Sequence, residues 1–501
     1  MSGKAKGKRR AEAQAEPASK KAIDSDDDEE LEFEDEFGDD FEEEEFVQEE
    51  DGEEGEEGAA GGSSMSKGDL MDMEAEDGVN VETEGRLWRA GDAIPEGEKL
   101  DYDSSAYDML HRMHMEWPCL TFAFAHDDLG EQRTKFPMTA YAIAGTQADD
   151  ASHDRIICAK LSQLAKTKHD EDSESDDDDD DDDADLDPMV EVQMVPHEGS
   201  VNRLKLMPQP DSSHICATWS GTGKVHIYDL SAPLSNLRAP GSANPRALEQ
   251  AQKPAFSFAG HKDEGFALDF SPVKPGVLAT GDCACGLHVW EPREGGQWTI
   301  DPEPYRGHTA SIEDVAWSPV EANVLMSCGC DSTVRVWDAR RKGGSALCVD
   351  EKHGKDINVL SWNKLVNYLV VTGCDDGSFR VWDLRSFANG EPVAKFHWHS
   401  QAITSVEWSP LESSSVAVTG EDHQLTLWDL ALEADPDADK AAMGRDDLAD
   451  LPPQLYFVHQ GQSDIKEVHW HRQMPGVLAS TAADSFHIFK PANHGDGAVN
   501  N

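Results

Sequence analysis

The chain is short of positive charge. It contains 43 Lys and Arg residues against 100 Asp and Glu residues, a formal net charge of −57 over 501 residues. Contacts to phosphate require Lys and Arg, so this balance argues against nucleic acid as a direct partner. It favours instead a protein partner that is itself strongly basic.

Long apolar segments and a cysteine framework are also lacking. No apolar run is long enough to cross a bilayer, and the first thirty residues contain no apolar segment of a secretory signal, so we expect neither feature. The nine cysteines are an odd number without the spacing of a disulfide framework. This favours a reducing intracellular compartment.

Catalytic and metal-binding patterns are equally scarce. Cys283 and Cys285, like Cys328 and Cys330, are spaced C-x-C, whereas zinc ligands are usually separated by two to four residues. The stretch "GTGK" at 221–224 lacks the other residues of a phosphate-binding loop. With no nucleophile–base pattern, we predict that the protein is not an enzyme and has no cofactor or metal.

The negative charge is concentrated in two stretches. Residues 1–77 contain 8 basic and 30 acidic residues, a net of −22, and residues 170–187 contain fourteen carboxylates and no basic residue. Blocks of like charge stay disordered and often act as interaction tails. We predict an acidic disordered region over 24–85 and an acidic loop over 170–187. In the loop, the residues expected to contact a basic client are Asp176, Asp178, Asp180 and Asp183.

The first 23 residues carry the opposite charge. Two basic clusters lie nine residues apart, and this spacing predicts a bipartite nuclear import signal formed by Lys8, Arg9, Arg10, Lys20 and Lys21. The alternative is a basic tail without such a role. Three serines have an acidic residue three places downstream, which suits acidophilic kinases and predicts phosphorylation of Ser25, Ser173 and Ser175.

From residue 197 onward the sequence repeats itself. Six segments each begin at a histidine and end in phrases such as "STVRVWDAR", "SFRVWDLR" and "QLTLWDL". The histidine and the closing aromatic residue are 29 to 31 positions apart in every segment. A period of about 40–45 residues with a Trp-Asp ending is the signature of WD40 repeats, each contributing the four strands of a propeller blade.

A buried hydrogen-bond network explains this spacing. The Trp of the third strand, the His before the blade and an Asp in the intervening turn are expected to bond one another. Asp331, Asp376 and Asp422 each lie six residues before such a Trp. The two preceding repeats have Thr222 and Ala284 at this position, so we expect weaker networks there.

Six repeats leave one blade to be found. Three strand-like runs within 117–162, "WPCLTFAFA", "FPMTAYAIAGT" and "DRIICAKL", supply it. We predict an all-β fold, a seven-bladed WD40 β-propeller over 117–490 followed by a tail at 491–501. The strand at 117–125 would complete the blade formed by the end of the chain and close the ring. The loop at 170–187 would then lie between two blades.

The segment before the propeller has a different period. Ala106, Met109, Leu110 and Met113 are spaced i, i+3, i+4 and i+7, which predicts an amphipathic helix over 101–116 that ends at Pro118. Two insertions lengthen the repeats, one at 231–252 and an acidic one at 431–453 that ends in Pro452 and Pro453.

These features together resemble the histone-binding WD-repeat proteins, and within that group the glutamate-rich WD-repeat proteins. The phrases that carry the resemblance include "AYDMLHR", "PCLTF", "ITSVEWSP", "DHQLTLWDLALE" and "HWHRQMPGVLAST", and the similarity extends over roughly 86–490. The resemblance implies a nuclear and nucleolar escort for a basic protein of the large ribosomal subunit. Histone binding is also attributed to this family.

The resemblance further implies a client-binding groove. In the histone-binding relatives a basic helix of the client lies between the N-terminal helix and the acidic Pro-Pro loop. The matching positions are Met109, Leu110 and Met113 on the predicted helix, and Asp435, Asp437, Asp439, Asp446, Asp447 and Asp450 in the insertion. The alternative is that the three apolar residues only pack the helix against the propeller.

Three functions therefore remain open. The first is a monomeric escort of a basic ribosomal protein, in contact with pre-ribosomal particles but not with membranes. The second is a histone chaperone. The third follows from "WDAR" and "WDLR", whose Arg340 and Arg385 match the motif of propellers that recruit substrates to cullin-type ubiquitin ligases. The alternative for these arginines is an ordinary basic repeat ending.

Overall fold

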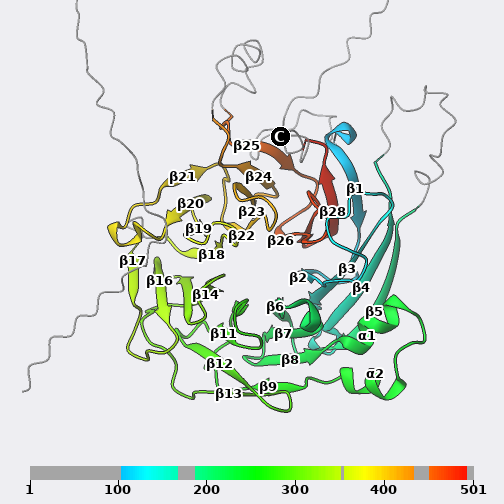
Figure 1. Ribbon diagram of the computed structural model, residues 1–501, viewed down its shortest axis with the longest axis horizontal. Coiled ribbons are helices and arrows are strands. Elements are labelled where there is room, and N and C mark those ends of the chain that lie inside the picture. The colour runs from blue at the N-terminus through cyan, green and yellow to red at the C-terminus, as the bar shows by residue number, and fades with distance from the viewer. Residues whose placement is uncertain (1–102, 168–186, 351–354, 434–450, 494–501) are drawn as a thin grey trace, which may run out of the picture. The chain divides into compact units, whose positions relative to one another are not determined.

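Seven antiparallel sheets of four strands each form a ring in the described residues (Figure 1). The computed structural model describes residues 103–167, 187–350, 355–433 and 451–493, all within the unit Thr83–Asn501. The seven-bladed propeller predicted from the repeats is confirmed. The basic tail, the acidic region at 24–85 and the tail from 494 lie outside the described residues.

Each blade runs outward from an innermost strand. The first three blades comprise β2 Cys119–Phe124, β3 Met138–Thr146, β4 Arg155–Leu164 and β5 Met189–Pro196; β6 Val201–Leu206, β7 Ile215–Ser220, β8 Val225–Asp229 and β9 Phe256–Phe258; and β10 Ala267–Phe270, β11 Leu278–Gly281, β12 Leu287–Arg293 and β13 Gln297–Ile300.

The next three blades follow the same order. They comprise β14 Ile312–Trp317, β15 Val324–Gly329, β16 Thr333–Asp338 and β17 Leu347–Asp350; β18 Ile357–Trp362, β19 Leu369–Cys374, β20 Ser378–Asp383 and β21 Ala394–His397; and β22 Ile403–Trp408, β23 Ser415–Gly420, β24 Leu425–Asp429 and β25 Leu455–His459. The seventh blade comprises β26 Ile465–Trp470, β27 Leu478–Ala482, β28 Phe486–Pro491 and β1 Tyr107–Met113.

Helices are few and short in this part of the chain. The insertion at 231–252 forms α1 Ser231–Arg238 and α2 Pro245–Ala251 between β8 and β9. Single turns of 3-10 helix lie at Ser104–Ala106, Ala151–His153, Pro210–Ser212 and Phe387–Asn389. No helix among the described residues is long and apolar enough to cross a membrane.

The predicted N-terminal helix is wrong. Residues Tyr107–Met113 form strand β1, which pairs antiparallel with β28 and is the outermost strand of the seventh blade. Partners almost 400 residues away in the chain therefore override a helical pattern, because pairing with β28 satisfies the backbone and buries side chains on both faces of β1. The strand at 117–125 was also predicted in the wrong place, since β2 opens the first blade and β1 closes the ring.

The acidic loop belongs to a blade and not to a junction between blades. Residues 168–186 lie outside the described residues, but they connect β4 to β5, which are neighbours in the first sheet. The prediction of a loop between two blades is therefore corrected. The three predicted strands of this blade correspond to β2, β3 and β4.

Histidine networks hold the blades as predicted where the Asp is present. His308 bonds Asp331 at 3.0 Å and Ser327 at 2.7 Å, and the indole N–H of Trp337 donates to the Ser327 hydroxyl at 2.8 Å. His399 bonds Asp422 at 2.9 Å in the same way. The partner expected for Asp376, His353, lies outside the described residues.

The third blade corrects one expectation. Ala284 occupies the predicted Asp position, but Asp282 takes over and bonds His261 at 3.0 Å, while Thr280 links His261 to Trp290. Its network is therefore complete. In the second blade, His197 bonds Thr218 and the carbonyl of Gly199, so these contacts involve no carboxylate.

Candidate binding surfaces

The three apolar residues of the predicted groove lie on a strand, and the structure packs them between blades. Met109 is 0 % exposed in the core between the first and seventh blades, and Met113 packs against the same core. Leu110 packs on the other side, against the core of the sixth and seventh blades. Met109 therefore has no surface to offer a client in this conformation.

The acidic insertion is followed by a strand that contacts β1. It connects β24 to β25, and β25 contacts the first residue of β1, because the Tyr107 hydroxyl lies 2.8 Å from His459 Nδ1 and the Tyr107 ring packs edge-on against Phe457. Burial lowers the pKa of His459 well below its usual range. The strand that carries the three apolar residues thus contacts β25, the strand that follows the insertion, while the six aspartates of the insertion lie outside the described residues.

Several predicted site residues lie outside the described residues. They are the acidic positions Asp435, Asp437, Asp439, Asp446, Asp447 and Asp450, the tract positions Asp176, Asp178, Asp180 and Asp183, the basic positions Lys8, Arg9, Arg10, Lys20 and Lys21, and the serines Ser25, Ser173 and Ser175. Their roles remain predictions.

The two arginines of the ligase motif are exposed. The Arg340 and Arg385 side chains are 66 % and 65 % exposed, and each forms a two-pronged ion pair with the Asp of its own Trp-Asp pair, at 2.8 and 2.7 Å. Arg385 also lies over the ring of Tyr368, 3.8 Å from its centre. Both follow the third strand of their blades, β16 and β20, so they lie on the same side of the ring in neighbouring blades. An adaptor would have to compete with these internal contacts.

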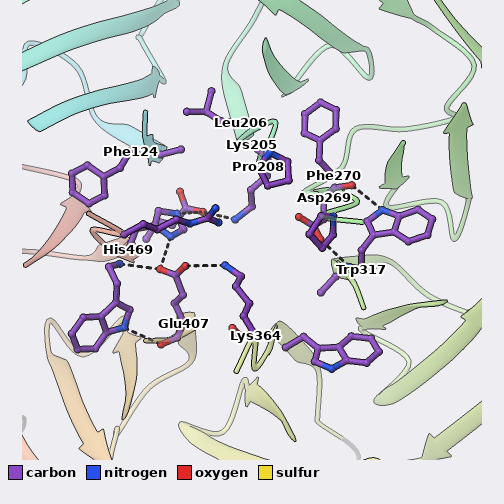
Figure 2. A pocket seen from close by; sticks show the side chains of 18 of the residues that line it. Phe124, Lys205, Leu206, Pro208, Asp269, Phe270, Trp317, Lys364, Glu407 and His469 are labelled. Atoms are coloured by element: carbon purple, nitrogen blue, oxygen red, sulfur yellow. Dashed lines mark hydrogen bonds and ion pairs between the residues drawn. The ribbon is translucent and has the colours of Figure 1, made fainter. Parts of the chain in front are cut away.

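A central cavity of about 260 Å³ is lined by the innermost strands of all seven blades. Figure 2 shows its charged lining, in which His469 and Lys364 both point toward Glu407. His469 is 3.0 Å from Glu407 and 3.4 Å from Glu467, and Lys364 is 4.0 Å from Glu407. Arg203 adds a 3.0 Å ion pair to Glu467.

These contacts divide the cavity carboxylates into two kinds. Burial alone would raise the pKa of Glu467 and Glu407, but neighbouring His469 and basic groups outweigh it, lowering the pKa of Glu407 to about 2 and that of Glu467 further. Asp269 is different, because burial raises its pKa to about 6 despite the N–H donated by Trp317. The pKa of Lys364 is lowered to about 8, mainly by the positive charge of Arg472 and to a smaller extent by burial.

Side chains of the innermost strands also join neighbouring blades, at six of the seven junctions in the ring. Backbone N–H groups of one innermost strand donate to side chains of its neighbour: Trp317 to Asp269, Leu360 to Asp314, Trp408 to Ser361, Trp470 to Glu407, Phe122 to Glu467 and Leu204 to Thr121. Phe122 to Glu467 joins the seventh blade to the first. Four cavity carboxylates thus bond across blade junctions, and we assign a structural role to Asp269, Asp314, Glu407 and Glu467.

The sequence analysis did not predict these contacts between innermost strands, although the sequence contains a pattern that indicates them. An acidic residue interrupts otherwise apolar innermost strands in "ALDF", "IEDVAW", "ITSVEW" and "IKEVHW". A carboxylate recurring in a strand that is buried on both faces indicates a buried partner. The C-x-C cysteine pairs were predicted not to bind a metal. In the described parts of the chain, no group of three potential metal-binding side chains lies together.

The repeats, the ring and the His–Asp networks define a WD40 β-propeller protein. The family model for the WD domain, G-beta repeat, matches residues 303–338, 344–383 and 390–429. A second model, described as histone-binding protein RBBP4 or a CAF1 complex subunit, matches residues 97–165, a range that includes β1 to β4.

Three curated relatives match most of the chain. The Arabidopsis thaliana protein named Heat Stress Tolerant DWD 1 is 45 % identical over 81 % of this chain and 92 % of its own length. Ribosome assembly protein rrb1 of Schizosaccharomyces pombe is 40 % identical, with 83 % and 87 % covered. Glutamate-rich WD repeat-containing protein 1 of Dictyostelium discoideum is 44 % identical, with 81 % and 85 % covered. The chain belongs to the family of these glutamate-rich WD-repeat proteins.

Proposed function

We propose that this protein is a non-enzymatic escort of a basic client in the nucleus and nucleolus, and that the client is a large-subunit ribosomal protein. The observation that carries the proposal is the combination of two properties in one chain. The chain has a net charge of −57, and it is 40 % identical to a relative named ribosome assembly protein rrb1. The surface and the acidic stretches recognise the client, because the carboxylates of the cavity bond across blade junctions.

The mechanism follows from charge. A ribosomal protein has basic extensions that are made for RNA, and without RNA they bind other polyanions or aggregate. The fourteen carboxylates of 170–187 offer these extensions a temporary substitute for RNA phosphate. Many weak contacts on one scaffold combine into a stable complex, and the higher charge density of ribosomal RNA then displaces the acidic stretches.

A histone client is the second candidate. It is favoured by the histone-binding model that matches residues 97–165, and a basic histone suits the same charges. Because both clients are basic, the identity of the recovered protein distinguishes them.

The test starts from affinity purification out of nuclear extract at moderate salt, with identification of the bound protein. The recombinant client is then titrated against the full chain and against a variant in which 24–57 and 170–187 are replaced by Gly-Ser linkers of equal length. We expect weaker binding and a flatter dependence on ionic strength, because exposed charges are screened beyond about 10 Å at 0.1 M salt.

Two results would contradict the proposal. One is equal affinity and equal salt dependence of the two proteins. The other is a bound protein without excess positive charge. Recovery of histones in place of a ribosomal protein would support the second candidate.

A further inference from the structure

Strand β5 differs from the other outermost strands of the ring. It has eight residues, whereas β9, β13, β17, β21 and β25 have three to five. Natural sheets keep their exposed edges short, charged or covered, because unpaired backbone groups attract further strands. The length of β5 therefore calls for an explanation.

Among the described strands, the one other outermost strand of comparable length is β1, with seven residues, and β1 is covered. The segment after β4 runs along it, with the N–H of Thr167 donating to the carbonyl of Asp108 at 3.0 Å and His111 bonding the carbonyl of Ala165. The outer edge of β5 pairs with no strand in the described parts of the chain. In Figure 1 it lies at the rim of the ring.

The side chains of β5 are unusual as well. Four large apolar side chains on this one strand are exposed, and they are Met189 at 48 %, Val190 at 49 %, Val192 at 41 % and Met194 at 50 %. The other exposed apolar side chains in the described residues are scattered over different elements. A contiguous exposed apolar patch marks an interaction site more often than single exposed residues do.

Three of these side chains form a row on one face. Val190, Val192 and Met194 alternate along the strand, and their partners on β4 are Leu161, Ala159 and Ile157. Leu161 belongs to the core between the first and seventh blades, and Ala159 packs against it. The row thus continues a buried apolar layer outward to the rim. On the opposite face, Val195 lies in a core that also contains Leu234 and Leu237 of α1.

We propose that β5 is a docking edge at which an extended, basic and apolar segment of the client pairs as a fifth strand of the first blade. The inference deepens the proposed function and rests on it. Backbone groups of the edge would bind the segment, and the row of Val190, Val192 and Met194 would select apolar side chains at alternate positions. This is a common way to recognise an extended peptide. The methionine side chain also adapts to varied partners.

Charge complementarity selects this occupant. The acidic stretch 170–187 ends two residues before Met189, and it contains fourteen carboxylates and no basic residue. A second copy of the chain would bring a second acidic stretch to the same edge, and the two would repel each other. An acidic stretch of the same chain would be repelled for the same reason. A basic segment meets the opposite sign. A client drawn in by the aspartates would therefore reach the edge directly.

The test removes the apolar row without changing the charge. Val190→Thr, Val192→Thr and Met194→Gln together preserve size and strand preference but make the row polar. The matched control makes the same kinds of change at exposed apolar positions elsewhere, with Val320→Thr, Val393→Thr and Leu365→Gln, residues that are 53 %, 57 % and 52 % exposed. The ligand is a recombinant large-subunit ribosomal protein, titrated at several salt concentrations.

We expect the β5 variant to bind at least tenfold more weakly, with an unchanged salt dependence and faster dissociation, and the control variant to bind like the wild type. Photo-crosslinking from position 192, with position 393 as the control site, should capture the client only from 192. This second measurement applies to the otherwise unmodified protein and does not depend on the fold of the triple variant.

The outcomes separate the two proposals. If the wild type binds no basic client, the proposed function fails and the inference fails with it. If the wild type binds and the β5 variant binds equally, or no crosslink forms from 192, only the docking edge is overturned. A wild-type dimer that the β5 substitutions dissociate would show that the occupant is a second copy, and would also overturn the inference.

Discussion

Replacing Glu467 with Gln tests whether the buried charges hold the ring. The Glu467 side chain is 1 % exposed and lies 3.0 Å from Arg203 and 3.4 Å from His469, and it accepts the N–H of Phe122 at 2.8 Å. Gln has the same size and can still accept that N–H. The substitution removes the negative charge, however, so the positive charges of Arg203 and His469 lose one of their buried counter-charges.

The expected cost follows from this geometry. Breaking a buried ion pair by removing one partner costs about 3–5 kcal/mol. Because Glu407 remains 3.0 Å from His469, we expect the lower end of this range. Because the unfolding entropy is about 2.1 cal/mol/K per residue, about 3 kcal/mol in a propeller of this size corresponds to a fall of roughly 4 °C in the thermal midpoint.

Glu191→Gln is the matched control. Glu191 pairs with Lys160 at 2.5 Å, but its side chain is 36 % exposed, and exposed pairs contribute about 0–1 kcal/mol. Differential scanning calorimetry at pH 7 should therefore show a fall of less than roughly 2 °C. Equal midpoints for the wild type and Glu467→Gln at pH 7 would refute the reasoning.

The pH dependence supplies a further check on the same pair of proteins. The folded state lowers the pKa of Glu467, so ionised Glu467 stabilises the fold fully above the ordinary pKa of about 4.3. This stabilisation is lost as the pH falls through the lowered pKa. The difference between the wild type and Glu467→Gln should therefore narrow below about pH 4. A difference that widens in acid would contradict the assignment.

Three further predictions concern the sites proposed from the sequence. Met109→Ala should destabilise the fold by about 2–5 kcal/mol because it leaves a cavity in the core, whereas Met194→Ala should cost under about 0.5 kcal/mol, as denaturant unfolding would measure. Replacing Asp446, Asp447 and Asp450 with Asn should leave the thermal midpoint unchanged but speed client dissociation in surface plasmon resonance; undiminished binding would exclude the insertion. Arg340→Ala combined with Arg385→Ala should abolish co-purification of a ligase adaptor and leave the basic client bound. If no adaptor co-purifies with the wild type, the ligase role is wrong.

The repeats made the propeller predictable, whereas β1 could not be read from local sequence. In a WD40 chain each blade carries its own strand pattern, and the histidine spacing locates the blades one by one. The segment around β1 contains Met109, Leu110 and Met113 at helical spacing because its two faces enter two different cores. A strand with apolar residues on both faces imitates a helix. Only the pairing with β28 distinguishes them, and that partner is remote in the sequence.

The histidine networks and the β5 edge show a similar division. Asp331 and Asp422 were predicted correctly as partners of their histidines, since the spacing from Trp is fixed by the hairpin between them. Asp282 was missed because a carboxylate two residues earlier in the same turn reaches the same histidine. The exposed row on β5 was also invisible in the sequence, because "MVEVQMVP" reads as an ordinary strand until its neighbours are known.

Positive charge is scarce in this chain, and the fold places part of it in the central cavity. Arg203 and Lys205 face Glu467 there and cannot offset the acidic surface. If both proposals hold, a field of this sign attracts a basic client over a screening distance of about 8 Å at physiological salt and mainly sets the rate of association. The apolar row of β5 acts only on contact and mainly sets the rate of dissociation. Added salt should therefore slow association of the client, while the β5 substitutions should speed its release. A salt effect confined to dissociation would show that the charges act within the bound complex and not at a distance.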